Sequence, residues 1–246
     1  MTNTTLQLRD DLLRLGVRAG GVLLVHGSLS ALGHVHGGAE TVIDGVLAAL
    51  GEGGTLLMPA LSYERVTPEH PFFDVRATPS NVGVIAETFR LRPGMLRSVH
   101  PTHSVCAVGP LAAQILDPHA EDSTPCGPRS PFHTLPKYNG QILMLGCGLA
   151  PNTSMHAVEE LVVPPYLYDP PIEYQITSDA IKLYTPHNFR GFRQRYDRIA
   201  QMLTSPALRR GPVLAGEAFL LDAAAMWNTA LAALRGDPLA FVEPSI

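Results

Sequence analysis

The chain has 246 residues and a formal net charge of −4, which is enough length for one large α/β domain with a substantial core. This charge offers no basic surplus for nucleic acid or an anionic membrane, and no basic cluster is longer than Arg209-Arg210. Apolar runs are too short to span a membrane, no signal-peptide core is evident, and the three cysteines form no CxxC pair. We therefore expect one cytoplasmic domain over residues 1–246, a monomer or homodimer without nucleic-acid or membrane partners.

The first part of the chain alternates helix-like and strand-like patterns. Leucines among charges predict a helix at residues 5–16, and an apolar run predicts a buried strand at 22–25. A loop of small and hydroxyl residues, 26–38, leads into a second helical pattern at 39–50. Backbone N–H groups of such a loop can hold a phosphate, but a plain connection fits as well, since neither GxxxxGK[ST] nor GxGxxG is present.

A third strand is predicted at residues 55–59, and an irregular segment rich in polar and aromatic residues follows at 60–79. Long irregular loops inside compact domains tend to be functional. We therefore treat this segment as a candidate wall of the substrate site, with Tyr63, Glu64 and Asp74 as its contacts. A simple surface excursion explains the composition equally well.

A polar cluster with Arg97, His100 and His103 precedes a strand predicted at residues 105–108, after a helix predicted at 82–91. Two histidines and an arginine so close together can serve an anion or a metal ion. The metal is the weaker interpretation, because no carboxylate or cysteine lies at ligand spacing and the other histidines are scattered. We expect no metal site.

The middle of the chain carries the clearest chemical pattern. An apolar run between glycines predicts a buried strand at 142–145, and a helical pattern follows at 155–162. His156 then lies in the first helical turn, where the helix dipole favours a neutral imidazole. Glu159 or Glu160 can reach it on the same helix face. The pattern predicts a His–carboxylate pair at the carboxyl end of a strand, where open α/β sheets place their sites, although a solvated histidine on an amphipathic helix fits the spacing too.

The remaining segments complete an α/β pattern. Ser130 is expected to cap a short helix reaching residue 135. Strands at 172–176 and 180–184 suggest a hairpin turning at Ser178-Asp179, and a helix with a basic face is predicted at 192–203. A last strand at 218–221 and a helix at 222–234, capped by Asp222, end the chain.

Taken in order, five segments resemble the aminoglycoside 3-N-acetyltransferase family of antibiotic acetyltransferases. They are HGSLSALG at 26–33, GGTLLMP at 53–59, RSVHPTHSV at 97–105, TPCGPRSPF at 124–132 and NTSMHAVE at 152–159. The resemblance covers almost the whole chain. It implies a three-layer α/β/α sandwich around a mixed central sheet, with acetyl-CoA as co-substrate and an amine as the acetyl acceptor.

The resemblance also assigns roles. It makes His156 the general base and Glu159 its acidic partner, and our mechanism adds Thr153 as a candidate for holding the thioester oxyanion. The expected acceptor contacts are Tyr63, Glu64, Asp74 and Glu160. The expected contacts of coenzyme A are Ser28, Leu29, Ser30, Ala31, Leu32, Gly33, Arg97, Ser98, Ser104 and Val105.

Two alternatives remain open at this point. Cys147 beside the pair can act as a nucleophile that passes the acyl group through a thioester, although a cysteine at a strand end is more often packing. The chain can also be a non-catalytic relative that binds coenzyme A. After residue 59 the chain departs from the family pattern, with Leu61-Ser62-Tyr63-Glu64-Arg65, so the expected acceptor is an aminoglycoside or another small amine.

Overall fold

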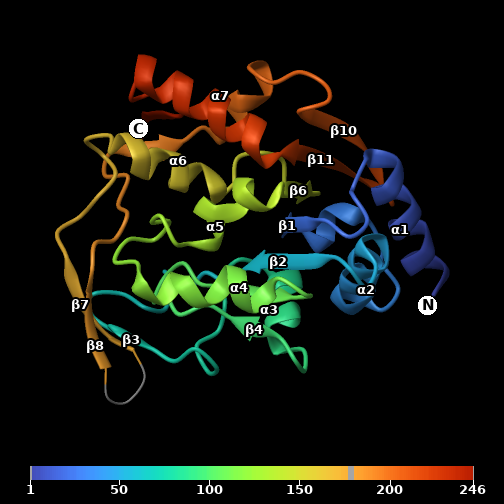
Figure 1. Ribbon diagram of the computed structural model, residues 1–246, viewed down its shortest axis with the longest axis horizontal. Helices are drawn as coiled ribbons and strands as arrows, with labels where there is room; N and C mark the ends of the chain where they lie inside the picture. Colours follow the sequence, from blue (N-terminus) through green and yellow to red (C-terminus); the bar gives the residue numbers. More distant parts are fainter. Residues whose placement is uncertain (1, 177–179, 246) are drawn as a thin grey trace.

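The structure, a computed structural model, describes residues 2–176 and 180–245 and is built around a seven-stranded mixed sheet (Figure 1). Its spatial order is β10-β11-β6-β1-β2-β5-β4. The central strand β1 pairs in parallel with β6 and β2, while β11 and β5 pair antiparallel to these neighbours. The strands are β1 (Val22–Gly27), β2 (Thr55–Pro59), β4 (Leu96–Arg97), β5 (Val105–Val108), β6 (Gln141–Leu145), β10 (Leu208–Val213) and β11 (Gly216–Asp222).

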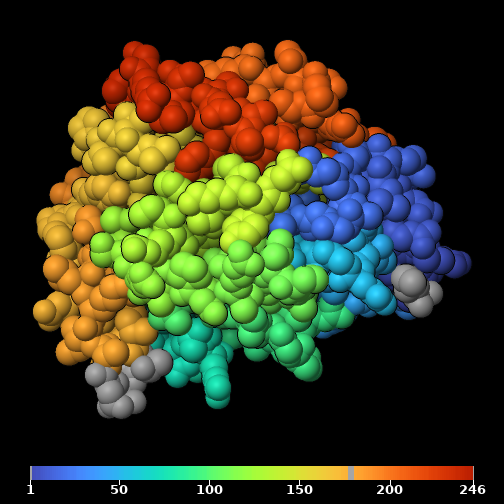
Figure 2. Space-filling view, in the orientation of Figure 1, coloured from blue at the N-terminus to red at the C-terminus, as the bar shows by residue number. Residues whose placement is uncertain are grey.

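Helices cover both faces of this sheet and complete the expected three layers. On one face lie α1 (Asn3–Leu15), α2 (Gly38–Leu50) and α3 (Val84–Leu91). The opposite face carries α4 (Ala112–Leu116), α5 (Pro131–Thr134), α6 (Ser154–Val162) and α7 (Ala223–Gly236), and Figure 2 shows α7, in red, lying beside α6, in yellow.

Strand β1 shows why the sheet has two cores. Leu23 and Val25 pack into the core beneath α1 and α2, whereas Val22 and Leu24 pack into the core beneath α4 to α7. Successive side chains of a strand point to opposite faces, so an unbroken apolar run needs cover on both sides. The apolar run predicted as a buried strand is therefore buried by helices on either side.

Two side-chain caps predicted from the sequence are confirmed. The Ser130 hydroxyl accepts a hydrogen bond from the backbone N–H of His133 at 3.1 Å, at the start of α5. The Asp222 carboxylate accepts from the backbone N–H of Ala225 at 3.0 Å, at the start of α7. Each satisfies a donor that the first helical turn leaves unpaired.

Two small sheets lie outside the main one. Strand β3 (Phe72–Phe73) pairs with β7 (Ile172–Ile176), which pairs with β8 (Ala180–Tyr184). The two strands of the predicted hairpin are thus confirmed, and its turn at Ser178-Asp179 lies outside the described residues. The second small sheet joins β9 (Phe192–Gln194) to β12 (Val242–Pro244).

The helix predicted at 192–203 is wrong. Residues 192–194 form strand β9, and only Tyr196–Gln201 adopt a 3-10 helix, η4. Pairing with β12 brings Arg193 and Arg195 to the carboxylate of Glu243. This tertiary pairing overrides the local helical spacing of the apolar residues.

Strand β10 had no counterpart among the predicted elements. Its sequence, LRRGPV, is polar and contains Pro212, and it pairs on one side only, with β11. An edge strand tolerates proline and charge, so it lacks the apolar alternation that marks a central strand.

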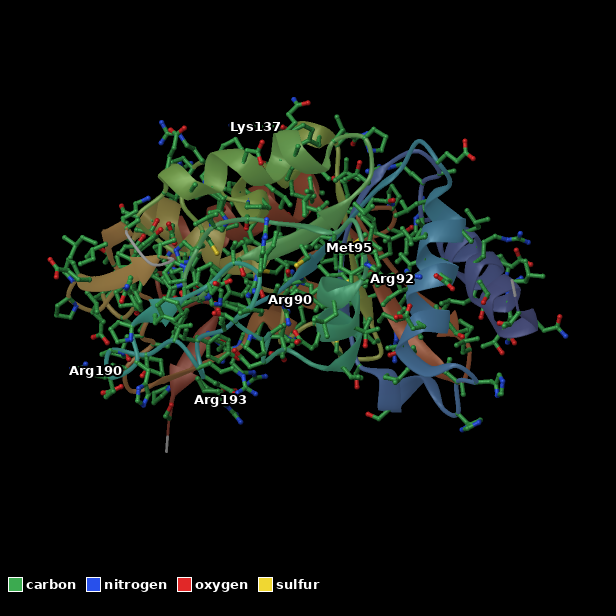
Figure 3. All side chains as sticks on the ribbon, turned by 90° about the horizontal axis from the view of Figure 1, so that it is seen from below. Arg90, Arg92, Met95, Lys137, Arg190 and Arg193 are labelled. Carbon is green, nitrogen blue, oxygen red and sulfur yellow. The ribbon has the colours of Figure 1, made fainter. Side chains whose placement is uncertain are left out.

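A surface ion-pair cluster joins two helices on the α1–α3 face. Arg92, which follows α3, extends toward α2 (Figure 3), where its guanidinium contacts Glu40 at 3.0 Å and also Asp44. In addition, none of the described helices combines the length and apolar character needed to cross a bilayer.

The buried histidine His119 makes stability depend on pH. Its side chain is fully buried, with Nδ1 2.9 Å from the Ser98 hydroxyl. Burial, with a smaller contribution from Lys182, lowers the pKa of His119 from 6.5 to about 3. The unfolded chain therefore takes up a proton below pH 6.5 that the folded chain does not, so stability is full above this pH and is lost as the pH falls, by about 1.4 kcal/mol per pH unit for one such group.

We expect His119→Gln to flatten this dependence. Between pH 7.5 and pH 5, the free energy of unfolding of the variant should fall by about 2 kcal/mol less than that of the wild type, because glutamine does not titrate. Urea unfolding at the two pH values measures the difference. His36→Gln, which changes an exposed histidine, should keep the wild-type dependence; equal slopes for wild type and His119→Gln would contradict the assignment.

Candidate active site

A cavity of about 600 Å³ opens at the carboxyl ends of β1, β2 and β6. This cavity, called the cleft below, lies where the parallel strands of an α/β sheet end and their loops diverge. Residues from the strand ends, the loop after β2, the start of α6 and the segment between β8 and η4 line it. They include His26, Gly27, Pro59, Tyr63, His103, Cys147, Thr153, His156, His187, Asn188, Phe189, Gln194 and Tyr196.

Helix α6 presents His156 to the cleft from its first turn, as predicted. Nδ1 of His156 lies 3.1 Å from Oε2 of Glu159, three residues further along the same helix. Side chains at this spacing lie on one helix face, which explains the contact. Glu159 therefore is the partner of His156, and the other ring nitrogen, Nε2, is left for the cleft.

Two tyrosines hold the Glu159 carboxylate in place. Tyr166 donates to Oε1 at 2.9 Å, and Tyr196 donates to Oε2 at 2.7 Å while its oxygen lies 2.8 Å from Nδ1 of His156. Glu159 has no exposed surface. A buried carboxylate without donors is costly, so the two hydroxyl groups both stabilise it and fix its orientation toward the ring. Neither tyrosine was predicted, because both lie outside the helix that carries the pair.

The next residue, Glu160, points to a different histidine. Its carboxylate accepts from the Thr124 hydroxyl at 2.5 Å and from the backbone N–H of Cys126 at 2.7 Å, and lies 2.8 Å from Nε2 of His187. These contacts occupy Glu160, and it is not among the described residues that line the cleft. The structure thus places the predicted acceptor contact behind His187.

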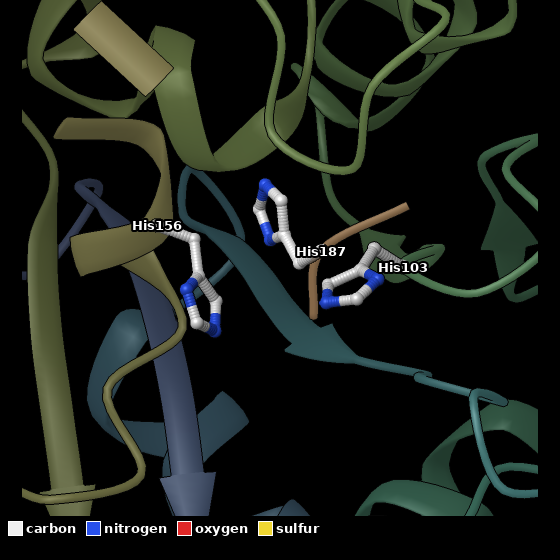
Figure 4. Close-up of side chains that lie close together, drawn as sticks. All are labelled: His103, His156 and His187. Carbon is white, nitrogen blue, oxygen red and sulfur yellow. The ribbon is translucent and has the colours of Figure 1, made fainter. Parts of the chain in front are cut away.

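Three histidines face one another across the cleft (Figure 4). The ring centroids of His103 and His187 lie 5.9 and 5.0 Å from that of His156, and 5.6 Å from each other. Burial, followed by the neighbouring histidines, lowers the pKa of His103 and of His187 well below the usual value. Their rings are therefore neutral at pH 7. The chain brings them from separate segments, and no spacing rule connects them.

The loop after β1 forms a second cavity of about 520 Å³, and Gly27 lines both this cavity and the cleft. Ser28, Leu29, Ser30 and Gly33 line it, and the hydroxyl groups of Ser28 and Ser30 lie 3.3 Å apart. Two further residues predicted to contact coenzyme A, Leu32 and Ala31, are not among the described residues that line this cavity. Leu32 is buried in the core, and Ala31 packs toward Gly146, where an added Cβ would lie 2.9 Å from the Ala31 methyl.

The segment before β5 is occupied by internal contacts. Arg97 donates to the Ser104 hydroxyl at 2.9 Å and to the carbonyl oxygens of Ala60, at 2.9 Å, and of Val75 and Thr78. Ser98, Ser104 and Val105 are buried, with at most 2% exposed surface. All four residues were predicted to contact coenzyme A. Among the described residues that line the two cavities, none of the four appears.

The remaining predicted residues divide between the cleft and the surface. Tyr63 and Thr153 line the cleft. Glu64 is exposed beside Tyr63, whereas Asp74 closes its own turn by accepting from the backbone N–H groups of Arg76, at 2.7 Å, and of Ala77, at 2.8 Å. Asp74 is thus a turn residue in this conformation.

Cys147 also lines the cleft, two residues after the end of β6. Burial raises the pKa of its thiol to about 11, so the thiol is protonated at neutral pH. Among the described side chains, no hydrogen bond joins it to His156, whose Nδ1 contacts Glu159 and Tyr196 instead. An activated Cys–His pair is therefore absent from the described residues in this arrangement.

Comparisons with known proteins agree on one family. The family model described as aminoglycoside 3-N-acetyltransferase matches residues 24–235. Aminoglycoside N(3)-acetyltransferase IV from Salmonella sp is 35% identical over 244 residues, covering 97% of this chain and 90% of the relative. A solved structure of a histidine-to-alanine mutant of aminoglycoside acetyltransferase AAC(3)-IVa, in complex with a gentamicin, matches with a TM-score of 0.83 at 33% identity. This match covers 97% of this chain and 90% of that chain. AAC-IIIb, binary with CoASH, has a TM-score of 0.82 at 29% identity and covers 97% of both chains.

The fold and these matches define the class of protein: it is an acetyltransferase. The chain belongs to the aminoglycoside 3-N-acetyltransferase family. The family resemblance in five short segments and the expected three-layer fold are both confirmed.

The loop after β1 provides a test of the packing that shapes the second cavity. Gly146 and Gly148 both have positive φ, of 74° and 65°. A Cβ at Gly146 would lie 2.9 Å from the Ala31 Cβ and 3.0 Å from the Ser28 carbonyl oxygen, whereas a Cβ at Gly148 would meet nothing within 4 Å. Both alanine variants carry a backbone cost of about 1–2 kcal/mol, and only Gly146→Ala adds a clash, of about 1–3 kcal/mol.

We therefore expect Gly146→Ala to unfold at lower urea concentration than Gly148→Ala. The difference between the two free energies of unfolding measures the contact with the loop, because the cost of positive φ is common to both. Equal losses of stability would show that the loop does not pack against β6 as described.

Proposed function

We propose that the protein transfers the acetyl group of acetyl-CoA to an amine of an aminoglycoside, with His156 as general base. The observation that carries this proposal is the His156–Glu159 pair at the wall of a cleft, in a chain of this family. A structural neighbour in complex with a gentamicin and another with CoASH support the two substrate classes.

In the proposed mechanism, Nδ1–H of His156 donates to Oε2 of Glu159, so the lone pair of Nε2 faces the cleft. Nε2 accepts the proton of the attacking amine as its nitrogen forms a bond to the acetyl carbon, and the carbon–sulfur bond breaks to release the thiolate. Glu159 stabilises the resulting imidazolium. General-base assistance of this kind is worth about 10²–10⁴ in rate, and positioning in the cleft supplies much of the remainder.

Thr153 is the proposed contact for the negative charge that develops on the acetyl oxygen. It lies just before α6, lines the cleft and is almost fully buried. The N-terminal end of a helix carries partial positive charge, so this position favours an oxyanion.

The second cavity is the proposed place of acetyl-CoA. It shares the lining residue Gly27 with the cleft, and we infer that a thioester bound along Ser28–Gly33 extends past this residue toward His156. Hydroxyl groups of Ser28 and Ser30 and the backbone of a short helix that starts at Leu29 suit phosphate and amide oxygens. The fit therefore depends on the loop after β1 and not on the buried segment around Arg97.

The acceptor is proposed to bind through neutral groups of the cleft. Within the described part of the chain, its lining includes neither Asp nor Glu. Tyr63 and Phe189 offer aromatic faces, which attract ammonium groups, and Asn188 and Gln194 offer hydrogen-bonding amides. Smaller amines with few charges are therefore included among the proposed acceptors beside aminoglycosides.

Transfer through Cys147 is the weaker mechanism for the same activity. Burial raises the pKa of the thiol to about 11, and among the described residues no hydrogen bond joins the thiol to His156, so this arrangement does not activate Cys147. A non-catalytic relative that merely binds coenzyme A would leave the His156–Glu159–Tyr196 contacts without a role.

We expect His156→Ala to lower kcat by about 10²–10⁴ with acetyl-CoA and a good amine acceptor, because the variant lacks the proton acceptor. Release of the coenzyme A thiol measures the rate across a panel of aminoglycosides and simple primary amines. Cys147→Ser should remain within a few-fold of the wild type. Full activity of His156→Ala would overturn the assignment of the general base, and a collapse with Cys147→Ser would indicate transfer through the cysteine. Coenzyme A binding without turnover on any amine would indicate the non-catalytic relative.

A matched pair of tyrosine variants tests how Glu159 is held. Tyr196→Phe removes a hydroxyl that contacts both Glu159 and His156, whereas Tyr166→Phe removes one that contacts only the far carboxylate oxygen. We expect Tyr196→Phe to lower kcat about 10-fold, which corresponds to an increase of about 1.4 kcal/mol in the activation free energy. Tyr166→Phe should lower kcat less. Equal effects on kcat, or effects confined to KM, would count against a positioning role for Tyr196.

A further inference from the structure

The histidine cluster of the cleft has the arrangement of a ligand set. His103, His156 and His187 each offer one ring nitrogen, and these three nitrogens all lie within 4.8 Å of one another. The other nitrogen of each ring is already engaged: Nδ1 of His103 lies 2.9 Å from the Thr102 hydroxyl, while His156 and His187 contact carboxylates. The nitrogens turned toward one another are therefore Nε2 of His103, Nε2 of His156 and Nδ1 of His187.

His187 supplies an independent observation that points to a ligand. Its side chain is only 4% exposed, and its Nδ1 is a buried atom without a hydrogen-bond partner among the described residues. Leaving a buried polar atom unpaired costs about 1–3 kcal/mol, and native structures keep few of them. The Glu160 contact at Nε2 keeps the Nδ1 face of the ring turned toward His103 and His156 (Figure 4).

We propose that His103, His156 and His187 form a binding site for a divalent transition-metal ion of the Zn²⁺ type. Three imidazoles with a fourth position open to a cleft are a donor set that Zn²⁺ accepts. The carboxylates of Glu159 and Glu160 orient two of the rings from behind, as acidic partners of metal-bound histidines commonly do.

A bound zinc ion would need the three ring nitrogens to lie closer together than they do in this structure. Zinc–nitrogen bonds of about 2.0–2.1 Å in a tetrahedral site place the nitrogens about 3.4 Å apart. The present spacing, up to 4.8 Å, exceeds this by as much as about 1.4 Å. Rotation of the three rings about their side-chain bonds is the movement that we expect to close this gap.

A bound metal ion would have a consequence for acetyl transfer, and this consequence rests on the proposed function. The ion takes the same lone pair of His156 Nε2 that accepts the proton of the amine. Metal binding and general-base catalysis then exclude each other, so Zn²⁺ is an inhibitor at this site and not an activator.

The binding test uses the full chain stripped of metal and titrated with Zn²⁺ in competition with a chromophoric chelator. The wild type should bind about one ion per chain, and His187→Ala should bind at least about 10-fold more weakly, the usual scale for losing a partner of a metal site. His36→Ala, at an exposed position, is the matched control and should bind as the wild type does. No stoichiometric binding by the wild type, or equal affinity of His187→Ala, would overturn the proposal.

A spectroscopic measurement on the wild type needs no variant to fold. X-ray absorption of the zinc-loaded protein should show only nitrogen or oxygen neighbours, at about 2.0–2.1 Å, with imidazole scattering. A sulfur neighbour at about 2.3 Å would assign the ion to Cys147 or another cysteine and overturn the histidine site.

The activity arm separates this proposal from the proposed function. Zn²⁺ should reduce turnover in proportion to its occupancy, and a chelator should restore it. If zinc occupancy rises while turnover stays constant, the metal site still stands on the binding results, but the assignment of His156 as general base is overturned. If turnover falls without binding to the wild type in the competition titration, the metal site is overturned and the base assignment stands on His156→Ala.

Discussion

The candidate active site depends on one buried carboxylate. Glu159 has no exposed surface, yet it carries contacts from three groups: a histidine of its own helix and the hydroxyl groups of Tyr166 and Tyr196. Burial of an isolated carboxylate would cost several kcal/mol, and hydrogen bonds to it recover that cost only if all the donors stay in place. The segments that carry Tyr166 and Tyr196 contribute no strand to the main sheet, and these two hydroxyl contacts hold them against helix α6. The same interaction that orients His156 therefore also fixes one wall of the cleft.

The sheet order explains why the wall stands where it does. The parallel trio β2-β1-β6 ends on one edge, and antiparallel β5 and β11 flank it. The loop after β1 and the turn after β6 leave the sheet side by side, with Gly146 small enough for the loop to pack over it. Two strand–loop–helix units thus lie side by side: the loop of serines lines the second cavity, and the histidine at a helix start lines the cleft.

Much of this could be predicted from the sequence because it is local. The strands β1, β2, β5 and β6 are apolar runs, the caps Ser130 and Asp222 act within three residues, and His156 meets Glu159 within one helical turn. The contacts that were not predicted join segments far apart in the chain. Tyr196 reaches His156 from forty residues away, and His103 and His187 reach it from other loops. Periodicity carries no information about such contacts, and at residues 192–194 pairing with β12 even reversed the local preference.

Adjacent glutamates on α6 divide the cleft between two roles. Successive residues of a helix project about 100° apart, so Glu159 and Glu160 cannot serve the same ring. One fixes His156 and the other fixes His187, and both rings then turn their remaining nitrogens to a common space with His103. A carboxylate behind an imidazole makes it a better proton acceptor and, equally, a better metal ligand. In the two proposals, the chemistry of the cleft is decided by what occupies the lone pair of His156 Nε2, a proton from an amine or a metal ion, since one lone pair cannot hold both.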